Sequence, residues 1–134
     1  MLLHQLNMAL YQKQFRDCIL VTTLPIVTDI VDVLPVKKVV YYCVDEFAEW
    51  AGHHRQQMQD METVLLAKSD IVIATSETLY QAKKFKAKNI YYLPHGVDVG
   101  HFQEASKKKS LGLPHPVIGY YGLFDERNDL QLIE

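Results

Sequence analysis

Apolar residues fall into short, almost unbroken runs along this chain, and segments with helical spacing separate the runs. The runs are rich in β-branched and aromatic residues, as in Val-Val-Tyr-Tyr-Cys at 39–43, which is typical of strands. Between the runs, apolar residues such as Leu6 and Leu10 recur every three or four positions, which indicates helices. The pattern predicts strands over 18–24, 38–44, 70–75, 90–93 and 117–121, helices over 2–15, 54–68 and 77–86, and a short helix or turn over 26–34.

This alternation of elements predicts the fold class. Strands that are apolar throughout are typical of a parallel sheet, and the intervening segments are long enough for crossover connections. We therefore expect an α/β fold with a Rossmann-like parallel sheet and helices on both faces. In the helix over 54–68, the apolar stripe of Met58, Met61 and Leu65 should face the sheet. The polar residues of that helix should face water: Gln56, Gln59, Asp60 and Glu62.

Composition narrows the class of protein. Hydrophobic residues make up 49% of the 134 residues and charged residues 22%, as in ordinary globular domains. The net charge of -2 indicates neither a nucleic-acid-binding protein nor an acidic tail. No apolar run is long enough to span a bilayer and the start lacks signal-peptide features, so we expect a cytoplasmic protein. Cys18 and Cys43 lie in apolar runs, which predicts buried, reduced thiols.

A sharp turn is predicted after the strand over 90–93. Pro94 cannot donate to a sheet ladder, and Gly96 can adopt backbone angles that other residues avoid. Turns at the carboxyl ends of parallel strands are where open α/β sheets bind ligands. The run over 117–121 also ends in a glycine, Gly122. Two such sheet edges joined by a short linker suggest two domains that face one cleft.

The motifs around these turns resemble those of a known family. Residues 93–98, Leu-Pro-His-Gly-Val-Asp, with Phe102, resemble the P-N-G-V-D…F signature of family-4-type glycosyltransferases, which have the two-domain GT-B fold. Residues 116–122, with 125–127 and 129–134, are similar to the opening strand, loop and helix of that family's second domain. Residues 41–46 and 67–77 fit the strands upstream. The resemblance covers roughly residues 15–134 in the family's order, and is closest to bacterial enzymes of polysaccharide biosynthesis.

The resemblance implies a domain division. Residues 1–103 would form the later part of the acceptor-side domain, 104–115 a linker, and 116–134 the first strand and helix of a truncated donor-side domain. The family's glycine-rich loop and its glutamate-rich motif are missing from these residues, so we expect a fragment. A strand over 117–121 would lack its neighbours. It would then add to the first-domain sheet, pair with a second copy to form a homodimer, or remain poorly ordered.

Asp45 and Glu46 directly follow the strand over 38–44, at the expected carboxyl edge of the sheet. In the resemblance they face the acceptor, and Asp45 could orient or deprotonate an acceptor hydroxyl as a catalytic base. Alternatively, Asp45 caps or salt-bridges the start of the next helix. For Glu46 a structural role is favoured, because adjacent residues on an extended segment point in opposite directions.

Further substrate-binding candidates come from the two turns. The resemblance implies that His95, Gly96 and Asp98 line the cleft near the donor, with His95 standing where the family usually has asparagine. The alternative is that Gly96 only forms the turn and Asp98 binds the local backbone. Gly119 and Gly122 would let the backbone approach the donor diphosphate, as glycines at strand-to-helix turns do. Arg127 would pair with that diphosphate through its guanidinium fork, or would lie solvated on the surface.

Three weaker features remain. The six histidines show no zinc-ligand spacing, and the resemblance implies a nucleotide-sugar substrate with no bound metal or other cofactor. The lysines at 83, 84, 86 and 88 predict a solvated basic face, with peripheral membrane contact as the alternative. Trp50 and Phe47 could stack on a sugar, although buried packing is the more ordinary role.

The resemblance therefore implies a glycosyltransferase that moves a sugar from a nucleotide-sugar donor to a glycan or lipid-linked acceptor, with retention at the anomeric carbon. We expect these 134 residues alone to be inactive, because groups that stabilise the departing diphosphate lie beyond them. Two alternatives stay open. One is a non-catalytic Rossmann-like interaction module that binds a complementary chain, and the other is a nucleotide-sugar epimerase of the same architecture.

Overall fold

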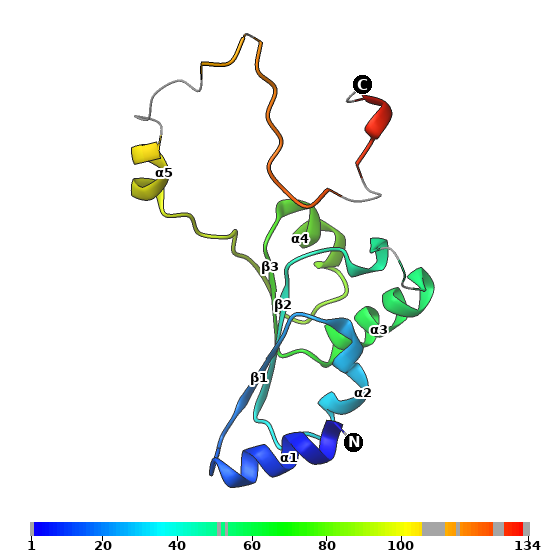
Figure 1. Cartoon of the computed structure of the whole chain (residues 1–134). Coiled ribbons are helices and arrows are strands. Elements are labelled where there is room, and N and C mark those ends of the chain that lie inside the picture. The colour runs from blue at the N-terminus through cyan, green and yellow to red at the C-terminus, as the bar shows by residue number, and fades with distance from the viewer. Residues whose placement is uncertain are drawn as a thin grey trace. The chain divides into compact units, whose positions relative to one another are not determined.

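A computed structural model describes residues 2–50, 52, 54–105, 112–114, 116–124 and 128–132. Four parallel strands form one sheet in the order β1-β2-β3-β4 (Figure 1). The strands are β1 (Ile19–Thr22), β2 (Lys38–Cys43), β3 (Ile71–Ala74) and β4 (Ile90–Tyr92). The helices are α1 (Leu2–Gln12), α2 (Thr28–Val31), α3 (Arg55–Lys68), α4 (Glu77–Lys83) and α5 (Val99–Ala105). The predicted α/β class with a Rossmann-like parallel sheet is confirmed.

The chain divides into two compact units, Met1–Gly96 and Val97–Glu134. The first unit holds the whole sheet together with α1 to α4, and the second holds α5 and a 3-10 turn, Leu130–Leu132. Residues 117–121, predicted as a strand, belong to the second unit and take part in no described sheet pairing. The domain assignment, including the boundary at residue 103, and a homodimer through 117–121 therefore stay predictions.

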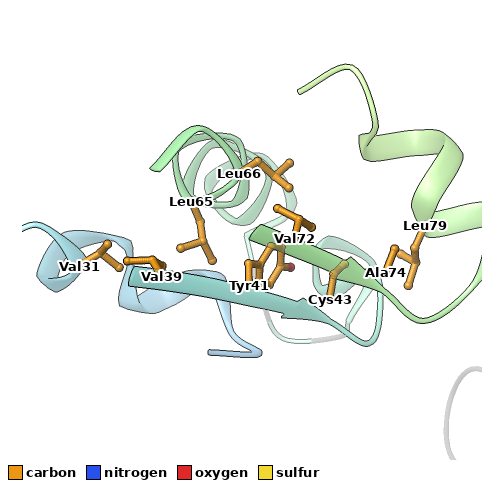
Figure 2. Packing of buried hydrophobic residues seen from close by; sticks show 9 residues of the cluster. All are labelled: Val31, Val39, Tyr41, Cys43, Leu65, Leu66, Val72, Ala74 and Leu79. Carbon is orange, nitrogen blue, oxygen red and sulfur yellow. The ribbon is translucent and has the colours of Figure 1, made fainter. Parts of the chain in front are cut away.

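The core lies on one face of the sheet (Figure 2). In the parallel register Thr22 pairs with Tyr41 and Tyr41 with Val72, so these neighbours point to the same side. Every second residue of β2 is buried there, as are Val72 and Ala74 of β3. Helices supply the opposing layer with apolar side chains from each connection: Val31 of α2, Leu65 and Leu66 of α3, and Leu79 of α4.

The opposite face of the sheet is more open. There Val21, Val40 and Ile71 form one row in register, and Tyr42, Ile73 and Tyr91 form the next. Val21 is 61% exposed and Tyr91 59%. The prediction put helices on both faces, whereas α2, α3 and α4 all contribute to one core cluster. The strand order explains this, because crossovers of one hand that always step in the same direction leave their helices on the same side.

The burial of residues along helix α3 differs from the prediction at one position. Met58 and Leu65 are buried and Met61 is half-buried, broadly as expected. Glu62, predicted to face water, is only 7% exposed. Its position explains the burial, since it lies four residues after Met58 and three before Leu65 and so shares their side of the helix.

Two further expectations concern cysteines and membranes. Both cysteines are free thiols, with Cys43 buried as predicted and Cys18 only half-buried. None of the described helices is both long and apolar enough to cross a membrane.

Candidate functional site

The carboxyl edge of the sheet gathers three segments of the first unit. Because the strands are parallel, the residues after β2, β3 and β4 all emerge at this edge. They bring Asp45 and Glu46, Ser76, and His95 and Gly96 to one rim. Ser76 caps α4, accepting a 3.2 Å hydrogen bond from the backbone N–H of Leu79.

Asp45 is exposed and held by two local donors. The backbone N–H of Glu46 donates to its Oδ1 at 2.8 Å. The indole Nε1–H of Trp50 donates to its Oδ2 at 2.9 Å. These bonds hold Asp45 to the turn that follows β2, and among the described residues it neither caps a helix nor forms a salt bridge, so its predicted role as base or orienter stays a prediction. They use two of roughly four lone-pair sites on the carboxylate, so Asp45 can still accept from a ligand.

Glu46 turns toward the helices and forms an ion pair. Its Oε2 accepts from Lys83 Nζ at 2.9 Å, and the same Nζ donates to Glu62 Oε2 at 2.7 Å. The Lys83 side chain is only 5% exposed, whereas that of Glu46 is 37% exposed. Glu46 thus ties the segment after β2 to the helix layer, in agreement with the structural role that was favoured for it.

The ion pairs continue into the core through Tyr41, whose hydroxyl donates to Glu62 Oε1 at 2.7 Å. Burial opposes the charge on Lys83, but hydrogen bonds with Glu62 and Glu46 raise its pKa above the usual lysine value. Burial raises the pKa of Tyr41 far above its ordinary range and that of the Cys43 thiol to about 11. At neutral pH Lys83 is therefore charged, and Cys43 is a protonated thiol with little nucleophilic character.

Sequence reasoning missed this network. It placed Lys83 in a solvated basic cluster, but Lys83 is buried, whereas Lys86 and Lys88 are exposed and Lys84 is half-buried. The sequence spacing of Lys83 and Glu62 was a signal that both are buried. Lys83 lies four residues after the buried Leu79, just as Glu62 lies four after Met58, so opposite charges occupy core positions of two successive helices.

His95 and Gly96 lie at the same rim, beyond β4. The Tyr42 hydroxyl lies 3.4 Å from His95 Nδ1, and the two rings meet edge to face at 6.2 Å. Gly96 does not adopt the unusual backbone angles that the sequence predicts for it. Its φ is not positive, and a Cβ at this position would meet no atom within 4 Å.

The remaining candidates belong to the second unit. Asp98 accepts from the backbone N–H of His101 at 3.0 Å, the local role given as its alternative. Gly119 and Gly122 lie outside regular secondary structure and have no positive φ. A Cβ on Gly122 would come within 3.0 Å of the Tyr120 hydroxyl. Arg127 lies outside the described residues.

Metal binding finds no support in the geometry, since no group of three or more His, Cys, Asp or Glu among the described residues could hold an ion. No protein-family model, curated protein or solved structure matches this chain. The glycosyltransferase family therefore remains a prediction from the motifs, and the geometry of the carboxyl edge has to support any function on its own.

Proposed function

We propose that this chain is the acceptor-side part of a two-domain glycosyltransferase. In this proposal the enzyme moves a sugar from a nucleotide-sugar to a glycan or lipid-linked acceptor, with retention. The observation that supports the proposal most is that Asp45 and His95 follow strands β2 and β4 at the carboxyl edge of a parallel sheet, where α/β folds bind ligands. Both side chains are exposed there and within reach of a ligand.

Asp45 is the residue of this rim best suited to meet an acceptor hydroxyl. A group that orients or deprotonates a hydroxyl must reach it at hydrogen-bond distance. Asp45 is exposed and keeps acceptor capacity, whereas Glu46 is engaged by Lys83. His95 offers a second polar contact on the same rim.

The donor diphosphate belongs to the second domain in this proposal. The resemblance assigns it to Gly119, Gly122 and Arg127, with the nucleotide-sugar as substrate and no metal. We place the reaction in the cytoplasm. The exposed Lys86 and Lys88 are available for contact with anionic lipid at the membrane surface.

Product analysis on the full-length gene product tests the proposal. UDP-, GDP- and dTDP-sugars would be offered with oligosaccharide and polyprenyl-phosphate acceptors, and the products identified by mass spectrometry. We expect a lengthened acceptor and free nucleoside diphosphate. An altered nucleotide-sugar with no transfer would indicate the epimerase. Unchanged donors together with a stable complex with another chain would indicate the interaction module.

A variant pair then tests Asp45 itself. Asp45→Asn should lower kcat/KM by about 100-fold, the usual contribution of general acid–base catalysis. Asp29→Asn, an exposed aspartate in the first turn of α2, should leave kcat/KM unchanged. Equal activity of both variants would remove Asp45 from the mechanism and leave the transferase assignment standing.

A further inference from the structure

Trp50 is the only tryptophan in the chain, and it remains 42% exposed at the carboxyl edge. Part of the indole is therefore accessible to a ligand at this edge of the sheet. The ring packs against Phe47 with centroids 5.1 Å apart and planes at 50°. Its Nε1–H donates to Asp45, which fixes the ring on a second side.

The pair of an indole and a carboxylate matches the chemistry of a sugar ring. A pyranose has an apolar C–H face that packs on an aromatic ring and a rim of hydroxyls that donate hydrogen bonds. Asp45 is exposed, and each of its oxygens accepts one local bond, so further lone pairs are available for sugar hydroxyls. The indole and the carboxylate are neighbours through a 2.9 Å hydrogen bond, so one ligand could contact both.

The pair is also held in place before any ligand binds. Phe47, against which Trp50 packs, is buried with Ala48 and Met58 of α3 in a small apolar cluster. Glu46, whose backbone N–H holds Asp45, is itself anchored by Lys83. A contact surface that is already ordered loses less conformational entropy on binding.

We propose that Trp50 and Asp45 form a subsite for one pyranose ring of the acceptor, with the sugar stacked on the indole and a hydroxyl bonded to the Asp45 carboxylate. The proposal rests on the function proposed above and identifies the part of the acceptor that this chain binds. No bond forms or breaks in the step.

The single tryptophan gives a direct readout. The chain would be titrated with methyl glycosides of glucose, galactose, mannose and N-acetylglucosamine up to about 100 mM, while the emission of Trp50 is followed. We expect a saturable change with at least one of them and none with glycerol. Saturation-transfer NMR on the same sugars provides a second measurement that needs no tryptophan.

Variants assign the binding to the two residues. By saturation-transfer NMR, Trp50→Phe should weaken binding about tenfold, and Asp45→Asn should weaken it by a similar factor. Phe85→Ala, which removes an exposed aromatic ring elsewhere, should leave the affinity unchanged. Circular dichroism would check that each variant is folded. If Trp50→Phe does not fold, the affinity of Asp45→Asn still tests the subsite.

The outcomes distinguish failure of the proposed subsite from failure of the proposed transferase function. Sugar binding that neither variant weakens, or no response to any of the sugars, overturns the subsite. If the full-length protein nevertheless transfers sugar, with an acceptor KM that Trp50→Phe does not change, only the subsite is lost. If transfer is absent as well, the proposed function is lost with it.

Discussion

The two faces of the sheet carry similar apolar side chains but differ in how deeply those side chains are buried. On the covered face Tyr41, Cys43, Val72 and Ala74 are fully buried beneath α2, α3 and α4. On the open face β-branched and aromatic residues of the same strands remain partly exposed. Apolar strands thus indicate that both faces favour burial, while the direction of the crossovers decides which face this stretch of chain can cover.

The covered face also contains the most polar contact in the core. The Glu62–Lys83 ion pair lies between α3 and α4 and reaches Tyr41 of β2. The helices thus provide hydrogen-bond partners as well as apolar surface. The two faces are therefore expected to respond very differently to substitution.

Lys83→Met should destabilise the fold most, because it leaves Glu62 with an uncompensated buried charge. We expect the free energy of unfolding to fall by about 3–5 kcal/mol, measured by urea denaturation. Lys86→Met, an exposed lysine three residues later, should change it by less than about 0.5 kcal/mol. Adding Glu62→Met to Lys83→Met should restore much of the loss, and a double variant as unstable as the single one would argue against the buried pair.

The next effect compares apolar residues of the two faces. Leu65→Ala deletes a fully buried side chain under the sheet and should cost about 2–5 kcal/mol. Val21→Ala on the open face should cost about 0.5 kcal/mol or less, because that side chain is largely in contact with water already. Equal losses in thermal or urea unfolding would show that the open face is covered in solution.

A smaller effect depends on pH. The Cys43 thiol has its pKa raised by burial from 9.0 to about 11, so the unfolded chain loses this proton first as pH rises. Stability should therefore be constant below pH 9 and fall by about 2 kcal/mol between pH 9 and 11 from this residue. Cys43→Ala should flatten that part of the curve. Tyr41 and Lys83, whose pKa values are also raised, add losses above about pH 10 that this variant keeps.

Much of the first unit could be predicted from sequence because its signals are local. Apolar runs located β1 to β4, and helical spacing located α1 and α3. Helix α5 was missed, since Val99–Ala105 contains Gly100 and carries no repeating apolar stripe. The strand over 117–121 is predicted from its apolar run and from the family resemblance, but a strand also requires a partner for its backbone groups, and these residues have no described sheet pairing.

The site was harder to predict than the fold for a related reason. Because Glu62 and Lys83 are charged, the sequence predicts that they face water. Their positions on α3 and α4 place them in the core instead, where they form an ion pair with each other. The adjacent Asp45 and Glu46 differ in the same way, because distant groups on α4 determine where Glu46 points. Such pairings become visible only when the packing of separate helices is known.

The common direction of the strands has a practical consequence for anyone who modifies this molecule. Every joint that leads from a helix into a strand lies on the rim opposite Asp45, including the stretch from Lys84 to Asn89 ahead of β4. A fluorophore, an affinity tag or a few extra residues introduced at Lys88 would thus sit a full strand length away from the rim that carries Asp45. The shared strand direction thus leaves one rim of the sheet for attachment, at a distance from the rim that carries Asp45 and His95.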